Sequence, residues 1–322
     1  MKAFQALLLG VCLAMAPLTM AAAAAPGTAA LSQAPTSVRV WGSVTRVDEK
    51  NARIEVADGA KKDQSIILHI NDDTSIVNNQ SKKALSIKDI KKGDTVYVWH
   101  DPIMTMSLPP QSSAQVIVTG IAADAMAGQL FEVIESSQNK NGDWLLFNQE
   151  RDLYLTVPAK LKNIPVFNSK DTLQAKDIAP GTRLLVWYNM VAESYPAQTT
   201  ATALLALPDA YDGYISIRDE KITVNGKAMG RDAYVDAKGN TFVPLSDIAK
   251  VWGFSVTWNS RTNTMTLRKG ESKIAFVRGK DEFTANGSKI ATLAPFAKNK
   301  TLYVAADSLR HLGDYKIVLP VE

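Results

Sequence analysis

The feature that constrains this chain most is an internal repeat, because a repeated segment must build the same structural unit twice. Residues 88–99 (KDIKKGDTVYVW) align with residues 176–187 (KDIAPGTRLLVW), with Lys-Asp-Ile, the Gly and Val-Trp in register. Further along, residues 107–113 (SLPPQSS) align with residues 194–200 (SYPAQTT). The sequence therefore predicts two copies of one module, β module 1 over residues 37–121 and β module 2 over residues 126–207.

Each module is predicted to consist of short strands. Residues 38–47 alternate apolar and polar side chains, which is typical of a half-buried strand. The other predicted strands cover residues 53–56, 65–70, 95–99 and 115–119 in module 1, and residues 129–135, 144–148, 153–157, 182–188 and 202–207 in module 2. About five short strands joined by turn-rich connections favour a small closed barrel of the OB-like kind, with a sandwich as the alternative.

A second repeat occupies residues 212–322. Residues 241–253 align without gaps with residues 301–313, and Asn225-Gly226 mirrors Asn286-Gly287. Because Asn-Gly between apolar runs is a strong hairpin signal, each half is expected to form a hairpin, a strand, a short helix and a strand. In the first half the helix is expected to begin at Ser246 as N-cap, to place Ile248, Val251 and Trp252 on one face, and to end at Gly253. The predicted fold class is therefore mainly β with minor α, with two β modules followed by an α+β domain.

Part of this second repeat resembles a known family. The segments at residues 222–226 (ITVNG), 241–258 (TFVPLSDIAKVWGFSVTW) and 262–267 (TNTMTL) resemble the copper amine oxidase N-terminal-like (stalk) domain, which is common in envelope proteins of Firmicutes. The resemblance extends over residues 212–322, and its second half departs from the pattern because Val304 and Ala305 replace Pro-Leu. In amine oxidases the related domain holds neither the copper nor the quinone. The resemblance thus implies an accessory or attachment domain.

The N-terminus predicts export. Lys2, the apolar run at residues 6–16 and the small residues 21–25 have the layout of a cleavable signal peptide over residues 1–25, followed by a flexible leader over residues 26–36. The only cysteine is Cys12, so the mature chain is expected to contain no disulfide and no Cys-ligated metal. No later apolar stretch is long enough to span a membrane. We therefore expect a secreted or cell-surface protein.

Charge and motifs narrow the function further. The formal net charge of +4 comes without a polybasic patch, so nucleic acid is not an expected partner. The sequence contains no H-E-x-x-H, no G-x-S-x-G, no P-loop and no G-x-G-x-x-G. With only three His, at positions 69, 100 and 311, no amine oxidase copper centre is expected. We therefore predict a protein that is not an enzyme and that needs no cofactor.

One cluster suggests an alternative function. His100 is followed by Met104 and Met106, and in an extended segment two Met side chains spaced in this way point in the same direction. Thioether and imidazole groups suit Cu(I), which prefers soft ligands. The alternative to attachment is therefore an extracytoplasmic copper carrier or sensor. Against it, Met is a common filler of irregular cores, and module 2 has neither the His nor the paired Met.

The two aligned Pro-containing loops are the candidate binding loops, with Pro109, Pro110 and Gln111 in one and Pro196 and Gln198 in the other. Loops on a rigid scaffold often carry binding, although Pro can also simply stiffen a connection between strands. Trp99 and Trp187 stand at equivalent strand ends and are expected in the core. The predicted partner is a cell-wall polymer, the extracellular matrix or an envelope protein.

Overall fold

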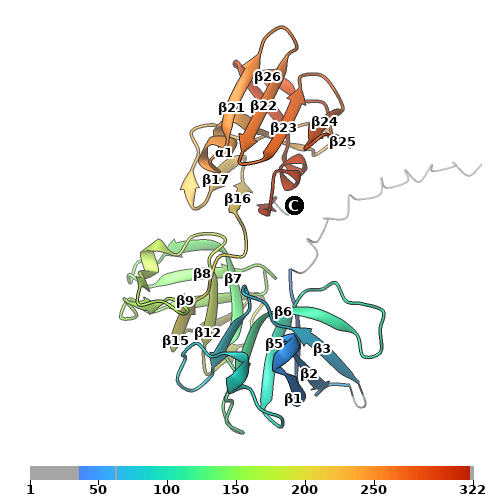
Figure 1. The fold of residues 1–322 in the computed structure, drawn as a ribbon. Coiled ribbons are helices and arrows are strands. Elements are labelled where there is room, and N and C mark those ends of the chain that lie inside the picture. Colours follow the sequence, from blue (N-terminus) through green and yellow to red (C-terminus); the bar gives the residue numbers. More distant parts are fainter. Residues whose placement is uncertain (1–35, 62–63, 320–322) are drawn as a thin grey trace, which may run out of the picture. The chain divides into compact units, whose positions relative to one another are not determined.

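The computed structural model describes residues 36–61 and 64–319. The predicted signal peptide and nearly all of the predicted leader lie outside these residues. The described chain is mainly β-sheet, with one α-helix and short 3-10 helices, as Figure 1 shows. The predicted fold class is thus confirmed. Within residues 36–61 and 64–319, no helix combines the length and the apolar character needed to cross a membrane.

The first barrel is formed by five strands, blue to green-blue in Figure 1. These are β1 (Val38–Asp48), β2 (Arg53–Asp58), β3 (Ser65–His69), β5 (Thr95–His100) and β6 (Gln111–Thr119). β1 pairs with β2 and β5, β2 pairs with β3, and β5 pairs with β6. The start of β6 runs parallel to β3 and closes the sheet on itself. A closed five-stranded barrel is the architecture of an OB fold, so the sandwich alternative is wrong here.

Apolar side chains at alternate positions along the strands point inward and fill this barrel. Val40, Val44, Val96 and Val98 are buried, while the residues between them along β1 are mostly exposed. They join a core of apolar side chains from all five strands. One strand was not predicted, namely β4 (Ser75–Asn78), which runs parallel to the end of β6.

The second barrel repeats this strand order. Its strands are β7 (Gln129–Gln138), β8 (Trp144–Asn148), β9 (Leu153–Val157), β12 (Arg183–Trp187), β14 (Ala197–Thr200) and β15 (Ala203–Ala206). β7 pairs with β8 and β12, and β8 pairs with β9. The strand corresponding to β6 is divided in two: β14 runs parallel to β9, and β15 pairs with β12. Three two-residue strands complete this region: β10 (Ile164–Pro165), β11 (Thr172–Leu173) and β13 (Val191–Ala192).

The two barrels share a third apolar core, which we call the shared core. Its buried members come from β4, β5 and β6 of the first barrel, from β12 and β15 of the second, and from the adjoining segments: Val77, Trp99, Val116, Val118, Ala127, Leu185, Trp187, Leu205 and Leu207. Trp99 and Trp187, predicted as core residues, are both buried. Each lies on the outside of its own barrel and is covered in this shared core.

The C-terminal region contains three sheets, yellow to red in Figure 1. The first contains β16 (Gly213–Arg218), β17 (Lys221–Val224), β18 (Lys227–Ala228) and β28 (Tyr315–Val318). The second contains β19 (Tyr234–Val235), β20 (Thr241–Pro244), β26 (Phe296–Lys298) and β27 (Thr301–Ala305). The third is a meander of β21 (Ser255–Asn259), β22 (Thr264–Lys269), β23 (Ser272–Val277), β24 (Glu282–Ala285) and β25 (Ser288–Ala291). One apolar core is built from side chains of all three sheets.

The two aligned halves of this region meet directly, because β20 pairs antiparallel with β27 and Val243 lies opposite Val304. α1 (Leu245–Val251) follows β20, whereas the corresponding segment after β27 is the 3-10 helix Ala306–His311. The expected cap at Ser246 is wrong: Pro244 is the N-cap, and Ser246 lies inside the helix. Ile248 and Trp252 are buried as expected, but Val251 is 40% exposed.

Candidate functional site

The connection between β5 and β6, residues 101–110, is a structured loop. The Ser107 hydroxyl donates to the Pro109 carbonyl at 2.7 Å, and the Ser112 hydroxyl donates to the Ile103 carbonyl at 3.0 Å. The backbone N–H of Thr105 also bonds the Gln111 carbonyl at 2.9 Å. These bonds hold both arms of the loop to the start of β6.

The connection between β12 and β14, residues 188–196, repeats this design. The Ser194 hydroxyl donates to the Pro196 carbonyl at 2.8 Å, as Ser107 does to Pro109. The Thr199 hydroxyl donates to the Met190 carbonyl, as Ser112 does to Ile103. Both loops also contain a cis peptide bond, Leu108-Pro109 in one and Tyr195-Pro196 in the other. We call residues 101–110 and 188–196 the paired loops.

The paired loops expose large apolar side chains at equivalent positions. Ile103 is 81% exposed and its counterpart Met190 is 82% exposed. Leu108 is 97% exposed and its counterpart Tyr195 is 90% exposed. A scattered exposed apolar residue needs no explanation. Because the two loops share two hydrogen bonds and present bulky apolar groups at the same two places, each is a candidate interaction site.

The prolines and glutamines predicted from the sequence lie beside these side chains. Pro109, Pro110, Gln111 and Pro196 are half-buried, and Gln198 is exposed. Gln111 Oε1 accepts a hydrogen bond from His69 Nε2 at 2.9 Å. The Gln111 side chain therefore also links β6 to β3. The Pro-containing loops lie where the sequence placed them, but Gln111 is the first residue of β6 and Gln198 lies within β14, so these two are strand residues. Met106 is fully exposed, and Leu108 and Tyr195, each directly before a proline, are almost fully exposed. A large apolar residue directly before Pro in a connection between two strands is the signal that could have found Leu108 and Tyr195.

The copper hypothesis concerns three residues in and beside the first loop. His100 is the last residue of β5 and is buried, and its Nδ1 donates to the Asp101 carbonyl at 2.7 Å. Burial lowers the pKa of His100 below its ordinary value. Met104 is 48% exposed, and Met106 is fully exposed. Among the described residues no group of three or more His, Cys, Asp or Glu is placed to hold a metal. Met is not among those residue types, so copper binding stays a prediction.

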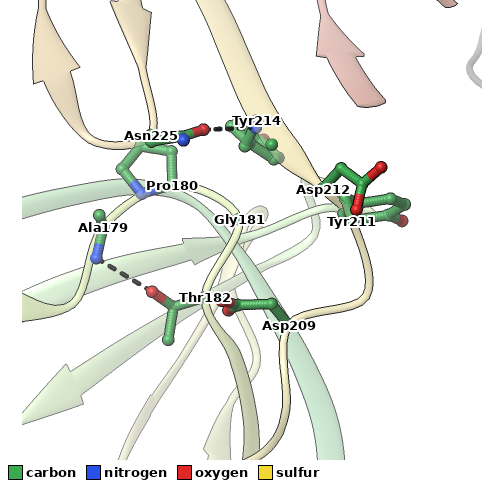
Figure 2. A pocket seen from close by; sticks show the side chains of 10 residues that line it. Ala179, Pro180, Gly181, Thr182, Asp209, Tyr211, Asp212, Tyr214 and Asn225 are labelled. Atoms are coloured by element: carbon green, nitrogen blue, oxygen red, sulfur yellow. Dashed lines mark hydrogen bonds between the residues drawn. The ribbon is translucent and has the colours of Figure 1, made fainter. Parts of the chain in front are cut away.

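A small polar recess of about 200 Å³ lies where three segments meet, as Figure 2 shows. These segments are the turn at residues 179–182, the stretch at residues 209–214 and the β17–β18 turn at Asn225. Asn225 Oδ1 accepts from the Tyr214 N–H at 2.7 Å, and the Thr182 hydroxyl accepts from the Ala179 N–H at 3.1 Å. The lining includes no Ser or Cys that could act as a nucleophile and no His that could act as its base. Its polar groups make hydrogen bonds that hold the backbone of the lining segments in place.

The β17–β18 turn at this recess gives a testable prediction. Gly226 has φ +73°, and a Cβ there would lie 2.5 Å from the Ala179 Cβ. Gly226→Ala is expected to lower the free energy of unfolding by about 1–3 kcal/mol, because it combines left-handed strain with a clash. Gly287→Ala is the matched control, since Gly287 has φ +87° in the corresponding turn with open space around it. Urea unfolding that shows equal losses for both variants would contradict the contact with Ala179.

Near this recess lies a group that we call the buried charge cluster: Glu132, Arg183, Tyr211 and Lys316. Glu132 and Arg183 lie opposite each other on β7 and β12, and Glu132, Arg183 and Lys316 are all buried. Lys316 Nζ lies 5.5 Å from the centre of the Tyr211 ring, and the Tyr211 hydroxyl lies 3.4 Å from Glu132 Oε2. Burial raises the pKa of Glu132 even though Lys316 and Arg183 oppose that rise. The sequence did not predict this cluster, because its members lie far apart in the chain.

Comparison with known proteins identifies the C-terminal region. Residues 223–317 match the copper amine oxidase N-terminal domain family. The match runs from β17 to β28 and covers less than a third of the chain, which confirms the resemblance seen in the sequence. In copper amine oxidases this domain is a non-catalytic accessory domain. No curated protein and no solved structure shows significant similarity to the chain.

Proposed function

We propose that this chain is a non-enzymatic, exported attachment protein of a bacterial cell envelope, and that it holds a wall-associated protein through the paired loops. The observation that supports this proposal is the equivalent exposure of Ile103 and Leu108 in one loop and of Met190 and Tyr195 in the other. The accessory nature of the family matched by residues 223–317 agrees with such a role.

The chemistry of the loops favours a protein partner. Covering apolar surface gains about 25 cal/mol per Å² removed from water. Leu, Ile and Met side chains gain this energy against another apolar protein surface, whereas the apolar face of a sugar ring stacks on a flat aromatic ring, which these side chains lack. Because the loops are fixed by their own hydrogen bonds, little ordering entropy opposes binding.

Two copies of a weak site also suit a partner that is displayed many times on a surface. When two sites on one chain engage one surface, the second contact is intramolecular, and the overall affinity exceeds that of either site. The predicted signal peptide would deliver the chain to such a surface. Cell-wall polymer is the alternative partner that the experiment separates from a wall-associated protein.

The test is sedimentation of the chain lacking residues 1–25 with purified cell walls. We expect it to pellet with walls that keep their attached proteins, and we expect protease treatment of the walls to abolish the part of the pelleting that depends on the paired loops. The double variant Leu108→Ser/Tyr195→Ser should lose at least about tenfold in affinity, because each loop loses a large apolar group that is almost fully exposed. Its unfolding should be unchanged, since neither side chain is packed.

Leu293→Ser is the matched control, because Leu293 is 43% exposed and lies in the C-terminal region. Loop-dependent pelleting with stripped walls would assign the ligand to the polysaccharide and contradict a protein partner. Undiminished pelleting of the double variant would contradict the role of the loops.

A further inference from the structure

Trp41 lies on β1, with its side chain on the outer face of the first barrel. Its side chain is 41% exposed. Three atoms of its six-membered ring lie 2.6–2.7 Å from the position that a Cβ would take at Gly59. Three nearly equal distances mean that the face of the ring, and not its edge, rests on Gly59. The indole is therefore held flat against the sheet, and only a glycine leaves room for it there.

Tyr97 extends this flat surface. It is the cross-strand partner of Trp41 on β5, and the two rings are 6.1 Å apart between centroids with 20° between their planes. Tyr97 is itself half-buried and packs against the shared core. The pair thus forms a rigid aromatic strip, anchored at Tyr97 and exposed at Trp41.

Polar side chains border the strip on both sides along β1 and β5. On one side the Arg39 guanidinium lies 5.7 Å from the centre of the Tyr97 ring, and its Nη1 donates to Gln129 Oε1 at 2.7 Å. On the other side Ser43 and Thr95 lie opposite each other, and both are exposed. Along β1 the outer face therefore carries a polar, an aromatic and a polar side chain in succession, over about 13 Å at the rise of a β-strand.

This arrangement matches the chemistry of a pyranose ring. Such a ring has an apolar C–H face, which stacks on an aromatic plane, and hydroxyl groups around its rim, which need hydrogen-bond partners. An apolar protein partner would instead require a wider hydrophobic patch. Here the apolar surface consists only of the exposed Trp41 ring and the half-buried Tyr97 ring, with polar groups beside them. A flat indole fixed in advance also costs little entropy on binding.

We infer that Trp41 and Tyr97 form a stacking platform for one pyranose unit of a polysaccharide, with Arg39 as a hydrogen-bond donor to its hydroxyls. This glycan site is separate from the paired loops and does not depend on the function proposed for them. The first barrel would therefore bind a polysaccharide, whereas the paired loops would bind a protein.

The test is calorimetric titration of the chain lacking residues 1–25 with two soluble probes, glycan fragments released from peptidoglycan by lysozyme and cellotetraose. We expect saturable binding of at least one probe by the native protein. Trp41→Ala should raise the dissociation constant about tenfold or more, because the stacking plane is removed. Gly59→Ala should also weaken binding, because the added Cβ displaces the ring.

Trp258→Ala is the matched control, since Trp258 is 44% exposed on β21, an edge strand of the C-terminal meander. This variant should bind glycan like the native protein. The loop variant Leu108→Ser/Tyr195→Ser should do so too, which separates this inference from the proposed attachment. The platform is ruled out if the native protein binds neither probe at millimolar concentration, or if Trp41→Ala binds as well as the native protein does.

Discussion

Replacing Trp187 by Ala is expected to lower the free energy of unfolding by about 3–5 kcal/mol, the range for a large aromatic side chain removed from a packed interior. Trp187 is only 8% exposed and lies in the shared core between the barrels. Its Nε1 donates to Asn79 Oδ1 at 2.7 Å in a buried position, and Lys82 Nζ lies 5.2 Å from the centre of its ring. The substitution removes the packing, the hydrogen bond and the cation–π contact together.

Two variants make this result interpretable. Trp187→Phe keeps most of the packing and loses the indole N–H, so it should cost about 1–2 kcal/mol. Trp258→Ala removes an indole that is 44% exposed and should cost about 0.5 kcal/mol or less. Urea unfolding followed by circular dichroism measures all three. A loss below 1 kcal/mol for Trp187→Ala would show that the barrels do not share a core in solution.

The position of Trp187 also shows how far the sequence could lead. Aligning residues 88–99 with residues 176–187 correctly identifies Trp99 and Trp187 as equivalent core residues. The alignment does not show whether such a residue points into its own barrel or out of it, because both copies have Trp at this position and would agree in either case. Only the pairing of one barrel with the other places both indoles in the shared core.

The barrel itself was predictable because alternating strands and turn signals are local properties. β4 was not, since Ser75–Asn78 is short and directly follows the turn-like residues 71–74. The helix boundary failed for a different reason: Ser246 has the chemistry of an N-cap, but β20 continues through Pro244, which leaves the cap to that residue. Tertiary pairing overrode the local preference.

The candidate site was predictable only in part. The Pro-containing loops could be found by alignment, but the protrusion of Leu108 and Tyr195 depends on how each loop folds back on its strand. Trp41 could not be recognised as a flat platform, because that depends on its packing against Gly59. Glu132 and Arg183 become neighbours only through the register of β7 and β12. Contacts of this kind are not properties of any local pattern.

The buried charge cluster gives the second large prediction. Arg183→Met is expected to lower the free energy of unfolding by about 3 kcal/mol or more at neutral pH, because it leaves a buried carboxylate with one compensating charge fewer. Glu132 then has Lys316 as its remaining cationic neighbour, with the Glu150 carboxyl adding repulsion. Lys316 is itself disfavoured in its charged form, since burial lowers its pKa.

The loss should depend on pH in a defined direction. Burial already raises the pKa of Glu132, and removing Arg183 raises it further because Arg183 favours the ionised form. A carboxyl with a raised pKa in the folded state favours folding below its unfolded pKa of about 4.3, and this contribution is lost as the pH rises through the folded value. The deficit of Arg183→Met relative to the native protein should therefore be smallest near pH 4 and grow towards neutral pH.

Urea unfolding at a series of pH values between about 4 and 7.5 measures this dependence. The double variant Glu132→Gln/Arg183→Met is the control, because it removes the carboxylate whose ionisation causes the effect. Its stability relative to the native protein should vary less with pH, and at neutral pH it should be more stable than Arg183→Met alone. If the deficit of Arg183→Met were constant across this range, the cost would come from lost packing or from the bond to Gln115, and Glu132 would not depend on Arg183 for its charge.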